Sequence, residues 1–81
     1  MDLFINSPHL QKQYKVAWIE LNSPDGNMII QPQHAPMIVR LRENSEVLYA
    51  LQTGKKEAVT VAAGVVHITR ESVTVLATEV K

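Results

Sequence analysis

Apolar and polar residues alternate with a period of two along most of the chain, a pattern typical of strands with one buried face. The pattern predicts strands over residues 3–6, 16–22, 28–30, 37–41, 46–51, 57–62, 65–69 and 72–78. The stretch 9–15 is polar and aperiodic, so we expect a surface connection there. No apolar residues recur at helical spacing over two turns, so no long helix is predicted.

Turn signals separate these strands. Pro24-Asp25-Gly26 favours a hairpin of about three to five loop residues, because proline fixes φ and glycine accepts a left-handed backbone. Thr53-Gly54 and Arg70-Glu71 predict two more hairpins, and Gly64 predicts a bend or bulge. Many short strands with frequent turns indicate an all-β fold, a small two-sheet antiparallel β-sandwich or flattened barrel formed by residues 1–81 as one domain.

Composition excludes several classes of function. The 81 residues contain no cysteine, and eight Lys and Arg balance eight Asp and Glu, so neither a basic nucleic-acid footprint nor a charged membrane-binding surface is expected. No apolar run reaches transmembrane length, and the acidic Met1-Asp2 start is unlike a signal peptide. A domain of this size also leaves little room for a ligand pocket of about 300 Å³. We therefore expect a soluble, neutral domain.

No pattern of catalytic or metal-binding residues is visible. His9, His34 and His67 are far apart and match no metal-ligand spacing, and no serine lies in a Gly-x-Ser-x-Gly turn. No glycine-rich loop is present to cradle a phosphate. The sequence thus predicts no catalytic residue, metal or cofactor, and favours a binding or scaffolding protein over an enzyme. Only His34 stands out, because Pro32 and Pro36 stiffen the backbone on either side of it.

Several motifs together carry a resemblance to a known family. The first pattern is a turn, a glycine, an apolar strand and a Pro-x-His-Ala-Pro loop, formed by Gly26, Met28, Ile30, Pro32, His34, Ala35 and Pro36. It resembles the signature of the epsilon subunit of F-type ATP synthases, called delta in mitochondria. Three later segments are also similar to motifs of that family, namely 54–57, 63–68 and 72–77. The resemblance covers nearly the whole chain.

The resemblance implies the N-terminal β-sandwich of a non-catalytic central-stalk rotor subunit of a proton-translocating ATP synthase. Such a subunit couples the gamma subunit to the membrane c-ring, as a peripheral component on the cytoplasmic side of the inner (plasma) membrane. It implies gamma contacts at Ser7 and His34, and c-ring contacts at the hairpin tip formed by residues 25–27, that is Asp25, Gly26 and Asn27. It also implies that Ile19 and Leu21 point inwards, which leaves Trp18 outside as a possible interface residue.

The chain departs from the family pattern at a few places. Gln33 and Ile29 stand where the family has glycines, Ala63 replaces the first glycine of a pair, and Asn27 stands where an acid is common. The family's sandwich is normally followed by a helical hairpin that brakes ATP hydrolysis. The printed sequence ends at Lys81, so we expect no such inhibition from these 81 residues. We also expect that the isolated chain can form a homodimer through the surface meant for gamma.

Two alternatives remain open at this point. One is an unrelated β-sandwich interaction or ligand-binding module, in which Trp18 and His34 would line a peptide or glycan site. The other is a small metal- or cofactor-binding enzyme domain using His34, although no second ligand lies at a useful spacing. For His34 itself, the simpler interpretation is that its ring only satisfies a local backbone carbonyl.

Overall fold

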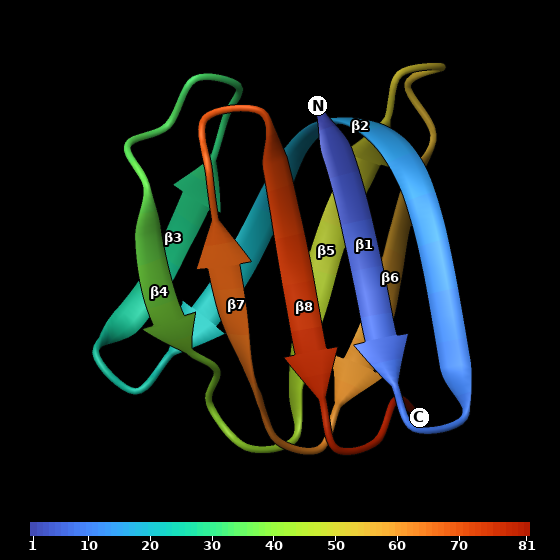
Figure 1. Ribbon diagram of the computed structural model, residues 1–81, viewed down its shortest axis with the longest axis vertical. Helices are drawn as coiled ribbons and strands as arrows, with labels where there is room; N and C mark the ends of the chain where they lie inside the picture. Colours follow the sequence, from blue (N-terminus) through green and yellow to red (C-terminus); the bar gives the residue numbers. More distant parts are fainter.

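The fold consists of strands alone, as the alternation predicts. The computed structural model describes all 81 residues and contains no helix. Its eight strands, drawn in Figure 1, are β1 (Asp2–Ser7), β2 (Leu10–Ser23), β3 (Gly26–Ile30), β4 (Met37–Arg40), β5 (Ser45–Leu51), β6 (Lys56–Val61), β7 (Gly64–Ile68) and β8 (Ser72–Ala77).

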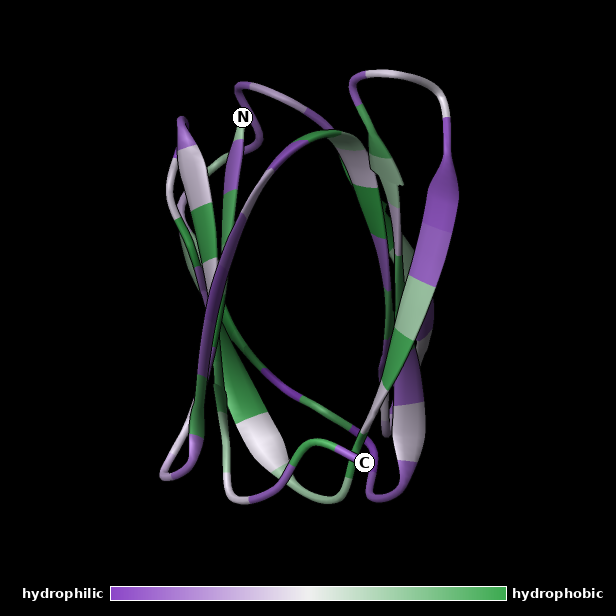
Figure 2. Cartoon of the chain, turned by 90° about the vertical axis from the view of Figure 1, so that its right-hand side faces the viewer, coloured by the Kyte–Doolittle hydropathy of each residue, from purple (hydrophilic) through white to green (hydrophobic).

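The strands form two layers that share β2. The front sheet of Figure 1 has the order β4-β7-β8-β1 and ends with the first half of β2. The back sheet contains β3, the second half of β2, β5 and β6. β1 and β8 run parallel, and the other neighbours are antiparallel. Figure 2 shows the two layers edge-on, with the chain passing between them. The predicted β-sandwich is confirmed.

The expected surface connection over residues 9–15 is wrong. Strand β2 begins at Leu10, and residues 10–15 pair antiparallel with β1, from Ser7 opposite Leu10 to Asp2 opposite Lys15. This half of β2 borders the front sheet, and its side chains Gln11, Lys12, Gln13 and Lys15 are exposed. Charged and polar residues suit an edge strand because they discourage pairing with other chains. Backbone pairing therefore makes a strand where side-chain periodicity gives no signal.

A β-bulge changes which side chains of residues 16–22 point into the core. Strict alternation from Ile19 and Leu21, which point inward as the resemblance implies, would place Ala17 on the same inner face. Instead Ala17 is exposed and Val16 is fully buried with Ile19. The register with β5 shifts between Val16 and Trp18, which is the position of an extra, unpaired residue. A bulge bends a strand and increases its twist, and here it turns β2 from one sheet into the other.

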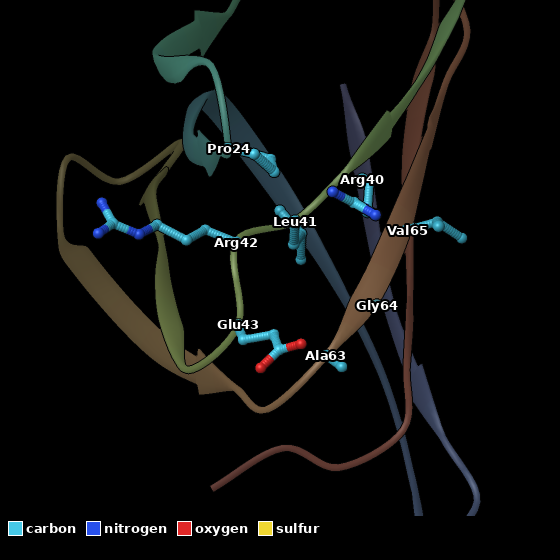
Figure 3. Close-up of a pocket in the computed structure, with 8 residues that line it drawn as sticks. All are labelled: Pro24, Arg40, Leu41, Arg42, Glu43, Ala63, Gly64 and Val65. Atoms are coloured by element: carbon cyan, nitrogen blue, oxygen red, sulfur yellow. The ribbon is translucent and has the colours of Figure 1, made fainter.

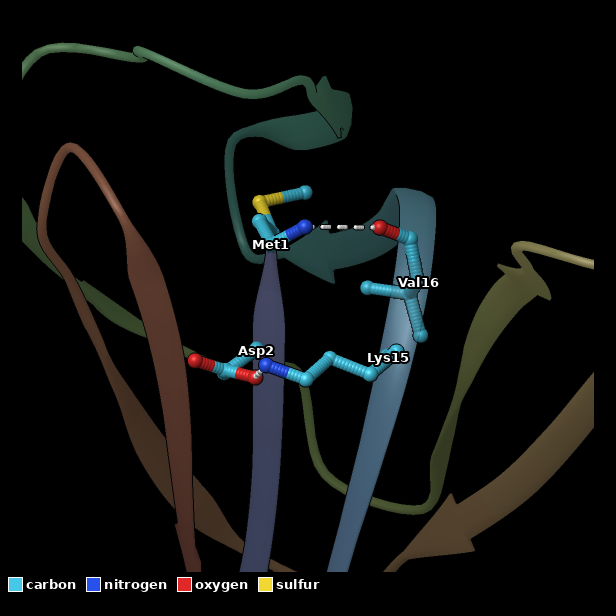
Figure 4. A network of polar contacts seen from close by, with 4 residues as sticks. All are labelled: Met1, Asp2, Lys15 and Val16. Atoms are coloured by element: carbon cyan, nitrogen blue, oxygen red, sulfur yellow. Dashed lines mark hydrogen bonds and ion pairs between the residues drawn. The ribbon is translucent and has the colours of Figure 1, made fainter.

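Hydrogen bonds from the first residue of the chain fix the point where β2 passes from one sheet to the other. The Val16 N–H donates to the Met1 carbonyl at 2.9 Å, and the Met1 ammonium donates to the Val16 carbonyl at 3.0 Å. Lys15 Nζ lies 2.5 Å from Asp2 Oδ1 in the same network (Figure 4). The hydrogen bond from Lys15 lowers the pKa of Asp2 below its usual value. The Lys15 side chain of this pair is largely solvent-exposed, so the backbone bonds carry most of the constraint.

The first hairpin is tighter than expected. Ser23 pairs with Gly26, which leaves a loop of Pro24 and Asp25 alone instead of three to five residues. The Ser23 hydroxyl accepts from the Asp25 N–H at 3.2 Å and donates to the Gly26 carbonyl at 3.0 Å. Gly26 closes the turn with a φ of +134°. Local bonding by Ser23 thus allows the shorter connection.

The interior is built from the inner faces of both sheets. A cluster of 16 buried apolar residues fills it, including Ile19 and Leu21 from the back sheet and Val66 and Ile68 from the front. Tyr14 and Tyr49 pack with ring centroids 5.1 Å apart, which joins the front half of β2 to β5. Burial, and after it the neighbouring Tyr14 phenol, raise the pKa of the Tyr49 phenol.

Gly64 is needed for close strand packing, not for the predicted bend itself. The bend lies one step earlier, at residues 62 and 63, and Gly64 is the first residue of β7. A Cβ at position 64 would lie 2.5 Å from the Leu76 carbonyl oxygen of β8. Only a residue without a side chain lets the two backbones approach this closely.

We expect Gly64→Ala to destabilise the domain by roughly 1–3 kcal/mol, because β7 must shift away from β8 to admit the methyl group. Urea unfolding measures this loss. The neighbouring exposed position provides the control, and Val65→Thr should stay within about 0.5 kcal/mol of wild type. Equal stability of Gly64→Ala and wild type would show that the close approach carries no strain.

The stability of the domain should also fall at alkaline pH through Tyr49. In the unfolded chain a tyrosine titrates near pH 10, and in the folded chain burial raises this pKa. The stabilising contribution is therefore complete below about pH 10 and is lost as the pH rises further. Urea midpoints from about pH 9 to about pH 11 should fall more steeply for wild type than for Tyr49→Phe. Parallel slopes would contradict the assignment.

Candidate functional site

Large apolar side chains gather on the outward surface of the front sheet. Ile38 on β4 is 71% exposed, Leu76 on β8 is 48% exposed, and Val65 on β7 is 39% exposed. Val65 pairs with Leu76, and Ile38 pairs with His67, so these side chains are cross-strand neighbours on one side of the sheet. We call this surface the front face and define it as Phe4, Ile38, Val65, His67, Thr74 and Leu76.

A group of large exposed apolar side chains is unusual on the outward surface of a sheet. Single exposed apolar residues are ordinary, but a contiguous group is typical of a binding surface. The sequence patterns drew attention to His67 only as a histidine without metal-ligand spacing, and they did not single out Ile38, Val65 or Leu76. The signal was available, because Val65-Val66 and Val75-Leu76 are adjacent apolar pairs. Such pairs place one residue on each side of a strand.

The back sheet holds Trp18 differently. Trp18 pairs with Ala50, which pairs with Lys56, so the three residues form one row across β2, β5 and β6. Trp18 faces outward as expected and is half-buried, with Lys56 Nζ 5.8 Å from its ring centroid. Ala50 lies between them and is only 4% exposed. Part of the indole surface is therefore already used within the domain.

His34 lies in a loop fixed by backbone bonds. The Gln33 N–H donates to the Arg70 carbonyl at 3.0 Å, which ties the loop 31–36 to the β7–β8 hairpin. The His34 N–H donates to the Gln31 carbonyl at 3.2 Å. His34 Nδ1 lies 2.8 Å from the Ala35 carbonyl, and it must be the donor because a carbonyl only accepts. The local contact that we considered for His34 is thus present, and it leaves Nε2 as the outward nitrogen.

Ser7 and His34 do not meet. Ser7 ends β1 next to the Pro8-His9 turn, whereas the His34 loop lies beside Arg70 at the opposite end of the front sheet (Figure 1). Ser7 nevertheless ends β1, and the His34 loop leads into β4, so the two positions mark opposite ends of the front sheet with the front face between them. A single partner touching both would have to cover that face.

The predicted tip residues are brought together by their turn. Asp25, Gly26 and Asn27 are exposed, and the hairpin lies at the end of the molecule where β1 also ends (Figure 1). Asn27 Nδ2 donates to Asn22 Oδ1 at 3.1 Å across the hairpin. The tip is therefore a braced, polar projection at one end of the sandwich.

The surface carries more open space than the size of the domain suggested. A groove of about 520 Å³ lies beside the tip, lined by Pro24, Arg40, Leu41, Arg42, Glu43, Ala63, Gly64 and Val65 (Figure 3). The expectation that the domain leaves little room for a pocket of about 300 Å³ is wrong, because this groove is larger. However, Figure 3 shows the Arg42 side chain extending away from Arg40 and from the other lining residues, so the two positive charges do not converge on one ligand position.

The structure does not form the other sites considered from sequence. Two further grooves of about 340 and 360 Å³ are present, and none of the three grooves is lined by Trp18 or His34. A shared peptide or glycan site for these two residues is therefore not formed. No group of three or more His, Cys, Asp or Glu side chains is placed to hold a metal ion. No helix is present that is long and apolar enough to cross a membrane.

The geometry defines a class, a small β-sandwich that presents an apolar sheet face and a rigid polar tip. Residues 9–81 match the family described as ATP synthase, Delta/Epsilon chain, beta-sandwich domain, so the chain belongs to that family. The family resemblance seen in the sequence is confirmed. The alternative of a β-sandwich interaction or ligand-binding module unrelated to this family is excluded.

Individual relatives agree with this assignment. Over 52 residues the chain is 36% identical to ATP synthase epsilon chain 2 of Burkholderia orbicola (strain AU 1054), covering 64% of this chain and 34% of that protein. It superposes with a TM-score of 0.88 and 21% identity on a chain in the cryo-EM structure of Euglena gracilis mitochondrial ATP synthase, OSCP/F1/c-ring in rotational state 1. That match covers 98% of this chain and 51% of the other.

A second structural match comes from the central stalk/c-ring structure of Tetrahymena thermophila mitochondrial ATP synthase. Its TM-score is 0.84 at 9% identity, covering 100% of this chain and 65% of the matched chain. At these identities the superpositions show the fold. The chain spans 34% of the length of its curated relative, so the activity of the whole relative is not transferred here.

The same substitution should cost stability on the inner side of the front sheet and almost none on its outer side. Ile38→Thr should change the free energy of unfolding by no more than about 0.5 kcal/mol, because the side chain is already exposed. Ile68→Thr should cost about 2–4 kcal/mol, since it leaves a cavity and buries a hydroxyl. Chemical denaturation measures both values. A large loss for Ile38→Thr would mean that Ile38 serves the fold instead of a binding surface.

Proposed function

We propose that this chain acts as the β-sandwich domain of a central-stalk rotor subunit in an F-type, proton-translocating ATP synthase. In this role it couples the gamma subunit to the membrane c-ring. The observation that carries the proposal is the front face, an uncovered apolar surface on a chain of the delta/epsilon family.

The front face has the composition of a protein interface. Its exposed apolar side chains, Ile38, Val65 and Leu76, are direct or diagonal cross-strand neighbours, and His67 and Thr74 lie beside them on β7 and β8. Arg40, Arg70 and the His34 loop lie at the edges of the face. A surface that mixes apolar and polar groups in this way is typical of a non-obligate interface. We assign this face to gamma, with Ser7 and His34 at its two ends. His34 then offers Nε2 to the partner, because its Nδ1 is held by Ala35.

The hairpin tip is the proposed contact with the c-ring. Asp25, Gly26 and Asn27 project at one end of the sandwich, braced by the Asn27–Asn22 bond. A short polar turn suits the polar loops of a membrane ring better than an apolar sheet face does. With Asn27 in place of an acid, Asp25 is the one carboxylate of the tip that can pair with a cation there.

The mechanism is mechanical. The domain makes and breaks no covalent bond, and it transmits torque because both contact surfaces belong to one rigid body. The shared strand β2 fixes the two sheets relative to each other, so a load at the tip reaches the front face without a hinge. We place the domain at the cytoplasmic side of the membrane, as a peripheral part of the complex.

Calorimetric titration with the cognate gamma subunit tests this role. Wild type should bind one to one, and Ile38→Asp should weaken the affinity more than about tenfold, because it buries an unpaired charge in the interface. His34→Ala should cost about 1–2 kcal/mol of binding free energy, as expected for one rim hydrogen bond.

Ala58→Asp is the matched control, because Ala58 is exposed on β6 of the back sheet. It should bind gamma like wild type. Weakening by Ala58→Asp together with normal binding of Ile38→Asp would move the interface to the back sheet. Absence of binding by wild type would refute the rotor role.

A further inference from the structure

Gln33 adopts a backbone conformation that its side chain makes unfavourable. Its φ is +69°, in the left-handed region that residues other than glycine rarely enter. Asn44 is the other such residue, with a φ of +51°. Asparagine is common in this conformation because its short amide can bond locally, and glutamine lacks that advantage. The two residues lie at opposite ends of the sandwich (Figure 1), since Gln33 is bonded to Arg70 and Asn44 to Ala62.

The loop itself does not need the glutamine side chain. The bond that fixes position 33 is its N–H to the Arg70 carbonyl, and a glycine would donate the same bond without strain. The Gln33 side chain is exposed, and none of the side-chain hydrogen bonds of the domain involves it. By contrast, the Asn44 side chain accepts from Lys81 Nζ at 2.8 Å. The Gln33 side chain therefore makes no bond within the domain that offsets this strain.

The position of Gln33 in the fold indicates which kind of contact offsets its backbone strain. Its loop leads directly into β4, which carries Ile38, and it is tied to the hairpin between β7 and β8. These three strands form the exposed apolar part of the front face. Gln33 thus stands at the rim of that face, next to His34. Strained residues that persist in a rigid setting are concentrated at binding sites.

We infer that the Gln33 side-chain amide is a specificity-determining contact, which hydrogen-bonds a polar backbone or side-chain group of gamma at the rim of the front face. This inference rests on the proposed function. The amide can donate and accept at once, so it suits a partner segment with an exposed peptide group. Strain in the free domain is then offset by a bond made only in the complex.

Two substitutions separate the side chain from the backbone. Gln33→Ala removes the amide and keeps the left-handed strain, whereas Gln33→Gly removes both. We expect both variants to bind the cognate gamma subunit about five- to tenfold more weakly than wild type in calorimetry, as for the loss of one hydrogen bond. Gln33→Gly alone should raise the melting temperature of the free domain, by roughly 3–6 °C, because the strain is relieved.

Asn44→Gly is the matched control, since it relieves the other left-handed residue far from the front face. It should leave the affinity for gamma unchanged. Normal gamma binding by Gln33→Ala and Gln33→Gly, with binding by Ile38→Asp still impaired, would overturn this inference and leave the proposed function intact. If wild type does not bind gamma at all, the inference and the proposed function both fail.

Discussion

The structure depends on one strand that belongs to two sheets. β2 pairs with β1 in the front sheet through residues 10–15 and with β3 and β5 in the back sheet through its second half. The transition needs the bulge at Ala17, which lets Val16 and Ile19 both point inward. Backbone bonds from Met1 hold Val16 at the turning point. This crossing and the common core together fix the two layers relative to each other.

The functional proposal follows from that rigid relation. The tip at residues 25–27 is built on the back-sheet half of β2, whereas the front face is built on strands of the other layer. The two surfaces therefore point to different neighbours while the shared strand and the common core keep them in one body. A part that joins a rotating shaft to a ring needs this property more than it needs any reactive group.

Sequence reasoning predicted the fold class and most strands because alternation and turn residues are local signals. It failed at residues 10–15, where an edge strand keeps polar side chains and is formed by backbone pairing with β1. It also failed at Val16 and Ala17, since a bulge depends on the partner strand and leaves no mark in the periodicity. For the site, the family motif drew attention to His34 and the tip. Ile38, Val65 and Leu76 were missed because their proximity arises only from the pairing of β4, β7 and β8.

The most direct measurement uses the absence of cysteine from the chain. Single cysteines placed as Leu76→Cys on the front face and Ala58→Cys on the back sheet can be alkylated with and without the cognate gamma subunit, and the labelled chain followed by mass. Gamma should slow alkylation at position 76, which becomes buried, and leave position 58 unchanged. Protection at position 58 alone, or at neither position in a chain that binds gamma, would contradict the assignment of the front face to gamma.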